Sequence, residues 1–147
     1  MDKRTIAREL AMQAVYQLDI QGKDALDMSG KFFAENNSDG LVLKLATSWT
    51  RGVWQNLQQC DDLISQAAVK WELSRLSQVD KSILRISTYQ LAFCPDIPAK
   101  VVINEAIEMA KKFSTESSSG FVNGVLDAIR KTLEKQKSKS MDENKDA

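Results

Sequence analysis

Apolar residues recur every three or four positions along most of the chain, which is the spacing of amphipathic helices. Residues 98–113 are the clearest case, with Ile103, Ala106, Ile107 and Ala110 on one face and charged or polar side chains on the other. No alternation of apolar and polar residues indicates a strand, and no repeat or glycine-rich phosphate loop is present. The pattern therefore predicts an all-α protein of about seven helices.

The helix expected at residues 78–93 is the centre of this prediction. It is apolar on most sides, which is typical of a buried helix, so we expect Gln90 within it to be buried and hydrogen-bonded. Ser77 is the expected N-cap. The only two prolines, Pro95 and Pro98, separate this helix from the next one.

Glycine and aspartate residues mark the other predicted helices. We expect Gly22 to end the first helix, Asp61 to cap the fourth, and Gly52 to let a neighbour approach the third closely. A last helix is expected to begin at Phe121 after a serine-rich loop, where Gly124 would permit close packing. The predicted helices before residue 77 span residues 3–20, 25–35, 41–59 and 62–70.

The length of 147 residues fits one domain with a substantial core. We expect residues 1–135 to form this compact helical domain. Residues 136–147 are polar with mixed charges and no apolar periodicity, so we expect a disordered tail. No apolar run approaches the roughly 18 residues of a membrane span, and the N-terminus is not a signal peptide, so we expect a cytoplasmic protein without membrane attachment.

Composition excludes several chemistries. The chain has no histidine, which removes the commonest general base and metal ligand and makes a Ser-His-Asp or Cys-His nucleophile impossible within it. Its two cysteines, Cys60 and Cys94, form no metal-binding motif. Chemistry based on carboxylates or lysine alone stays open from composition, but we assign no catalytic residue and expect no metal and no cofactor. The 20 basic and 20 acidic residues balance, so any affinity for nucleic acid must come from a local patch or from a partner.

Five groups of motifs occur at a specific spacing along the chain. They are Arg8-Glu9 with Gln13-Ala14-Val15-Tyr16, then Asp80 with Ile83-Leu84-Arg85-Ile86 and Tyr89-Gln90-Leu91, then Ile97-Pro98, then Ile103-Asn104-Glu105-Ala106 with Ala110-Lys111, and finally Phe121-Val122-Asn123-Gly124-Val125-Leu126. Together, over about residues 4–133, these motifs resemble the NusB family of transcription antitermination factors.

The resemblance implies two packed helical sub-bundles, at about residues 1–73 and 74–135, within one NusB-like domain. It also implies a non-enzymatic, RNA-binding function. Members of the family pair with NusE, a small-subunit ribosomal protein. The pair binds the boxA element of ribosomal-operon RNA and joins the RNA polymerase antitermination complex.

An arginine-rich start of the first helix contacts RNA in this family. Lys3, Arg4 and Arg8 match that motif, whereas Thr5 and Ile6 stand where further arginines are common, so we expect weak RNA binding by this chain alone. From the residues alone, Arg4 and Arg8 would be a solvated helix edge. Lys100 could extend the basic patch.

One aromatic residue and two asparagines of the family motifs could belong either to the RNA-binding surface or to the core. Phe121 could stack on an unpaired base or anchor the core. Asn104 and Asn123 are expected to be buried hydrogen bonders that tie helix ends together.

A second face is a candidate for protein binding. Glu9, Gln13 and Tyr16 share a flank of the first helix that its core stripe does not use, and an exposed tyrosine among polar groups is typical of an interface. Glu72 and Asp80 offer acidic groups to a basic ribosomal protein, although each is equally consistent with a helix-cap charge. The sequence leaves open whether this surface also forms a homodimer.

Three alternatives remain beside the antitermination factor. NusB-like domains also occur fused to ribosomal-RNA cytosine methyltransferases, but this chain has no cofactor loop to match that role. A stand-alone enzyme is disfavoured by the missing histidine. A NusB-like adaptor that binds protein and has weakened or lost RNA binding is kept open by the thinned arginine motif.

Overall fold

The computed structural model describes residues 1–68 and 76–146, and across these residues it contains seven helices and no strand. The prediction of an all-α protein with about seven helices is therefore confirmed. The helices are α1 (Lys3–Gln21), α2 (Lys23–Asn36), α3 (Gly40–Gln55), α4 (Leu57–Ala67), α5 (Gln78–Phe93), α6 (Ala99–Phe113) and α7 (Glu116–Asp146).

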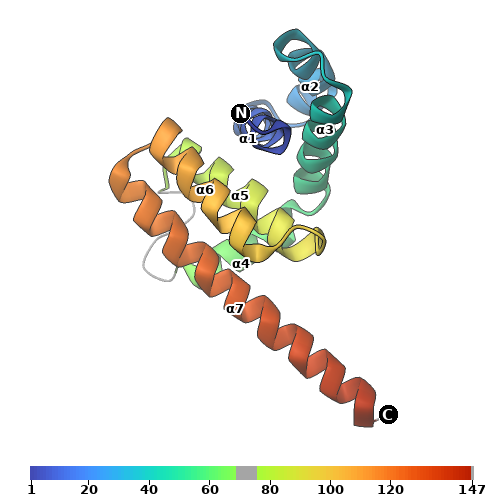
Figure 1. Cartoon of the computed structure of the whole chain (residues 1–147), viewed down its shortest axis with the longest axis vertical. Coiled ribbons are helices and arrows are strands. Elements are labelled where there is room, and N and C mark those ends of the chain that lie inside the picture. The colour runs from blue at the N-terminus through green and yellow to red at the C-terminus, as the bar shows by residue number, and fades with distance from the viewer. Residues whose placement is uncertain (69–75, 147) are drawn as a thin grey trace.

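The helices gather into two groups that meet along α1 and α5 (Figure 1). The first group contains α1, α2 and α3, and the second contains α4 to α7. Because α4 packs on α5 and α7, it belongs with the second group of helices. The long helix α7 packs on α6 and then continues away from the body of the protein (Figure 1).

Helix α5 is the central element, because it packs against α1, α3, α4, α6 and α7. Ile83, Leu84 and Ile86 are fully buried, and Gln90 is buried and accepts a hydrogen bond, as predicted. Ser77 caps the helix by accepting from the amide N–H of Asp80. The last residue of the helix is an exception to the expected burial, since Phe93 is 42% exposed.

Three predicted boundaries were wrong. The last helix begins at Glu116 rather than at Phe121, because the expected serine-rich loop is helical from Glu116 and Thr115 Oγ1 accepts from the amide N–H of Ser118. The expected helix at residues 41–59 ends at Gln55, because Asn56 leaves the helical conformation and its amide Nδ2 donates to the carbonyl of Gly52. Asp61 consequently lies inside α4 and caps nothing. At the other end, α7 runs to Asp146 where the sequence predicts a disordered tail, and residues 134–142 are exposed along it.

The expectations for two glycines had opposite outcomes. A Cβ on Gly52 would overlap the ring of Tyr89, so this glycine lets α3 and α5 approach closely, as predicted. Gly124 has nothing within 4 Å of the same position, so the expected close packing there is absent. Gly22 ends α1 with φ 64°, the left-handed conformation that favours glycine.

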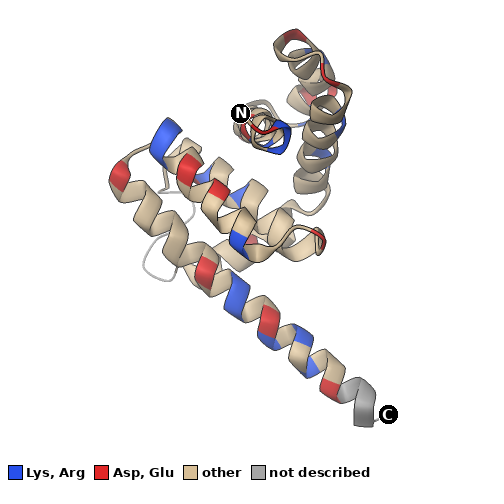
Figure 2. Cartoon of the chain, viewed as in Figure 1, with Lys and Arg blue, Asp and Glu red and all other residues tan. Residues whose placement is uncertain are grey.

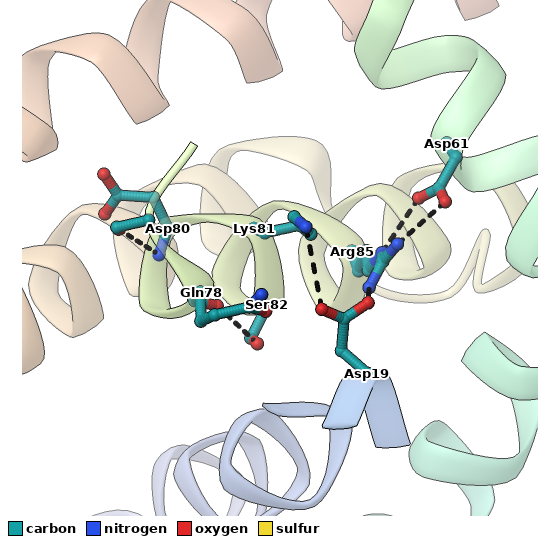
Figure 3. Close-up of polar contacts among 8 residues, drawn as sticks. Asp19, Asp61, Gln78, Asp80, Lys81, Ser82 and Arg85 are labelled. Carbon is teal, nitrogen blue, oxygen red and sulfur yellow. Dashed lines mark hydrogen bonds and ion pairs between the residues drawn. The ribbon is translucent and has the colours of Figure 1, made fainter. Parts of the chain in front are cut away.

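A nearly buried ion network joins α1, α4 and α5 (Figure 3). Arg85 donates two parallel hydrogen bonds to Asp61, both 2.9 Å, and a third to Asp19 at 2.7 Å. Lys81 lies 3.6 Å from the second oxygen of Asp19. Burial opposes the charge of Arg85, but its bonds to Asp61 and Asp19 outweigh this and raise its pKa.

The network makes stability depend on pH through Asp19. Burial alone would raise the pKa of this carboxyl, but the hydrogen bond and charge of Arg85 outweigh burial and lower it. Asp19 therefore stabilises the fold fully above its unfolded pKa of about 3.9, and the contribution is lost as pH falls through the lower folded value.

We predict that Asp19→Asn lowers the free energy of unfolding by about 1.5–3 kcal/mol at neutral pH, because a hydrogen bond to a charged group is lost. The difference from the wild type should narrow below about pH 4. Urea unfolding from neutral pH into the acid range measures the loss of unfolding free energy and its decrease at low pH. Asp27→Asn, at an exposed position on α2, is the matched control. An Asp19→Asn defect that stays constant down to about pH 3 would contradict the assignment.

Candidate nucleic-acid interface

A groove of about 750 Å³ lies between the start of α1, the middle of α3 and the turn from α5 to α6. Arg4 and Arg8 enter it from α1, and Trp49 enters from α3. Tyr89 and Phe93 enter from the last turns of α5. The other lining residues are Leu45, Ser48, Cys94, Asp96, Ile97, Pro98 and Val101.

Arg8 forms the floor of the groove rather than part of its surface, since its side chain is only 3% exposed. Its Nε donates to Gln90 Oε1 at 3.2 Å, and Nη1 lies 3.5 Å from Glu105 Oε1. Its guanidinium lies 5.2 Å from the ring centroid of Trp49. Thr5 donates to the same oxygen of Glu105 at 2.8 Å.

This environment leaves the Arg8 side chain little access to RNA, so its contact with RNA stays a prediction. Burial lowers the pKa of Arg8, and Glu105 opposes the shift, yet an arginine remains charged at any physiological pH. The Arg8 guanidinium instead makes contacts inside the protein that connect α1 to α3, α5 and α6. A phosphate would have to displace these partners to reach it.

Of the predicted basic residues that remain accessible, Arg4 lines the groove, and Lys3 and Lys100 each neighbour a lining residue in the sequence. Arg4 is exposed and forms no ion pair with any residue that the structure describes. Lys3 is 59% exposed and pairs with Asp39 at 2.9 Å. Lys100 is exposed on the first turn of α6, between the lining residues Pro98 and Val101. Two of the five predicted RNA-binding residues, Arg4 and Arg8, therefore line one groove, and Lys3 and Lys100 are adjacent in sequence to lining residues.

Phe121 does not line this groove. It is half-buried against the core on the second turn of α7. The first turn of α7 is tied to the beginning of α5, because Ser118 Oγ donates to Asp80 Oδ2 at 3.0 Å, whereas the groove lies at the end of α5. Its proposed contact with RNA therefore stays a prediction that needs a second surface.

Sequence reasoning missed the aromatic side chains of the groove. The rings of Tyr89 and Phe93 stack with centroids 5.6 Å apart, and Phe93 is exposed beside Arg4. Their spacing of four residues, just before Pro95, is the signal that the sequence offers for this pair. Asn104 and Asn123, expected to be buried, are both exposed.

A second hollow, of about 480 Å³, lies between α1, α2 and the helix ends at Val79 and Phe113. Gln13 and Tyr16 line it together with apolar side chains, among them Met12, Met28 and Phe32. Two of the predicted partner-binding residues thus share a largely apolar surface that the core does not fill.

The other three predicted partner-binding residues are placed differently. Glu9 accepts from Lys112 at 2.9 Å and 3.1 Å, and so holds α1 to α6. Asp80 is only 9% exposed and bonds to Ser118, so it joins α5 to α7 and is not a surface acid. Glu72 lies outside the described residues.

The described residues offer little other chemistry. They contain no group of three or more cysteine, aspartate or glutamate side chains that could hold a metal ion. Burial raises the pKa of the Cys60 thiol to about 12 and also raises that of Cys94, so neither is a reactive thiolate at neutral pH. No helix among the described residues is long and apolar enough to cross a membrane.

Comparisons with known proteins agree with this fold. The model of the NusB family matches residues 5–131. The transcription antitermination protein NusB of Clostridium perfringens is 42% identical over 133 residues, which are 89% of this chain and 98% of that protein. The same protein of Anaeromyxobacter dehalogenans is 42% identical over 134 residues, covering 89% of this chain and 92% of its own length.

Solved structures give the same result. NusB of T. maritima is 40% identical, with a TM-score of 0.80 over 89% of this chain and 92% of that one. A complex of the antitermination factors NusB and NusE with double-stranded RNA contains a chain that is 25% identical, with a TM-score of 0.81 over 90% of this chain and 98% of that one.

The family model and the curated relatives place this all-helical fold in a class of transcription antitermination factors, which are not enzymes. The chain belongs to the NusB family. Membership confirms the resemblance drawn from the sequence motifs, as well as the expectation of a non-enzymatic protein.

We predict that Arg8→Ala lowers the free energy of unfolding by about 3–5 kcal/mol, because it breaks a buried charge network and leaves Glu105 without that partner. Arg4→Ala should stay within about 0.5 kcal/mol of the wild type, since Arg4 is exposed. Denaturant unfolding compares the two, with exposed Arg51→Ala as a further control. Equal stability of the two variants would show that Arg8 is not a structural residue.

Proposed function

We propose that this chain is an antitermination factor that binds boxA-type single-stranded RNA of ribosomal operons together with NusE. The observation that carries the proposal is the groove at the start of α1, where Arg4 and Phe93 are both exposed in a chain of the NusB family. The related NusB chain solved with NusE and RNA supports both partners. We extend the proposal to the RNA polymerase antitermination complex, and hence to the cytoplasm.

The chemistry of the groove suits a single strand. Lys3, Arg4 and Lys100 would contact phosphates around the rim, and Phe93 presents a ring on which an unpaired base can stack. Three cations are few, and Lys3 is already paired with Asp39. Affinity of the chain alone should therefore be low and should rise when a partner adds its own contacts.

The largely apolar hollow at Gln13 and Tyr16 is our proposed surface for NusE. Interfaces between proteins typically have an apolar centre with aromatic residues and a polar rim. Here Met28 and Phe32 supply the apolar part, while Gln13 and Tyr16 supply hydrogen-bonding groups. The same surface could bring two copies of this chain together in the absence of NusE.

An adaptor that binds NusE without contributing to RNA binding is the second candidate. The observation that favours it is the burial of Arg8, which removes one of the two arginines of the motif from the surface. The two candidates differ in one respect: only the antitermination factor should raise the affinity of NusE for RNA.

Fluorescence anisotropy of labelled boxA RNA, titrated with this chain, with NusE and with both, tests the proposal. We predict that the mixture binds more tightly than either protein and that binding weakens with salt. Within the mixture, Phe93→Ala should cost about 1–3 kcal/mol of binding, the value of one stacked base. Arg4→Gln should reduce the slope of log affinity against log salt by about 0.7, the effect of one phosphate contact.

Two further variants serve as controls for this experiment. Lys23→Gln removes an exposed charge on α2, away from the groove, and should leave RNA binding unchanged. Tyr16→Asp should weaken association with NusE, measured by calorimetry without RNA. A mixture that binds RNA no better than NusE alone would refute the antitermination factor and favour the adaptor.

A further inference from the structure

Residues 130–139 of α7 carry a concentration of positive charge in a chain whose net charge is zero. Five basic side chains and one acidic side chain lie between Arg130 and Lys139. Figure 2 shows these charges along the part of α7 that extends beyond the other helices. The match to the family model ends at residue 131, so most of this segment lies outside the part of the chain that the family model describes.

Three lysines of this segment form one straight row. Lys131, Lys135 and Lys139 are each separated by four residues, so they lie on one face of the helix at intervals of about 6 Å. Lys131 is 64% exposed and lies 3.2 Å from Asp127. Lys135 and Lys139 are exposed and form no ion pair with any other described side chain.

Repulsion among these three lysines destabilises the helix that carries them. Like charges four residues apart destabilise an isolated helix. Beyond Leu133 the described side chains of α7 are exposed, so tertiary packing does not offset the repulsion. A negatively charged ligand that lies along the row would remove the repulsion and stabilise the helix.

We infer that the row Lys131, Lys135 and Lys139 binds the phosphate backbone of RNA that continues beyond the groove. The inference rests on the proposed function, because it needs RNA at the groove. Charge complementarity favours a polyanion, and the spacing of about one helical turn is similar to that of successive phosphates in an extended strand.

The position of the row supports a continuous path for the RNA. Helices α6 and α7 are joined by a short turn and pack side by side in antiparallel order (Figure 1). The beginning of α6, where Lys100 borders the groove, therefore lies beside the part of α7 from which the helix projects. RNA leaving the groove across the beginning of α6 would next meet the lysine row.

The test compares two double variants that lower the net charge equally. Lys135→Gln with Lys139→Gln removes two members of the row, and Lys23→Gln with Lys31→Gln removes two exposed lysines of α2. Binding is measured by anisotropy in the mixture with NusE over a salt series. The labelled RNAs are boxA alone and boxA extended by uridines on both sides.

We expect the row variant to reduce the salt slope by about 1.4 on the extended RNA, which is two phosphate contacts at about 0.7 each. The wild type would then lose about sevenfold more affinity than the variant over a fourfold rise in salt. The short RNA should show no such difference. Lys135→Arg with Lys139→Arg should keep the wild-type slope, because charge is retained.

Three results would overturn the inference while leaving the proposed function intact. The first is an equal loss in both glutamine doubles, which would indicate a general effect of net charge. The second is an equal loss on short and extended RNA. The third is wild-type binding by the row variant, as expected if the row serves an acidic protein. Failure of the wild-type mixture to bind any RNA would instead refute the proposed function itself.

Discussion

The interior charge of Arg8 is the interaction on which the proposed binding surface depends. Its guanidinium contacts Gln90 of α5, Glu105 of α6 and the ring of Trp49 of α3, so one side chain of α1 joins both helix groups. The groove above it is bounded by the same helices. A buried arginine is tolerable only because its donors find partners, and each partner belongs to a different helix. The arrangement of the groove is therefore coupled to the packing of the core.

This use of Arg8 leaves a small set of cations for RNA. Arg4 and Lys100 remain exposed, and Lys3 is shared with Asp39. Because affinity for a phosphate backbone grows with the number of neutralised phosphates, such a surface favours cooperation with a partner. Stacking on Phe93 adds contact with bases that does not depend on charge. We propose that the groove contributes a binding site and base stacking on Phe93, while NusE and the lysine row of α7 supply further contacts with the RNA.

The sequence predicted the elements whose pattern is local. The boundaries of α5 and the burial of Gln90 followed from apolar spacing and from Ser77. The sequence could not predict which charged residues are internal. Arg8 and Asp80 carry charges that usually lie at the surface, and they are buried because Gln90, Glu105 and Ser118, all distant in sequence, provide partners. Asn104 shows the reverse, a motif residue that is exposed because α6 turns it away from the core. Such outcomes depend on tertiary contacts that periodicity does not encode.

Amide hydrogen exchange of the complex with NusE, recorded with and without boxA RNA, tests the central claim most directly. We predict that RNA slows exchange in the first turns of α1 and in residues 89–101, which border the groove. The hollow at Gln13 and Tyr16 should already be protected by NusE and should change little when RNA is added. Slower exchange confined to other surfaces, with the groove unaffected, would contradict the assignment of the RNA-binding site.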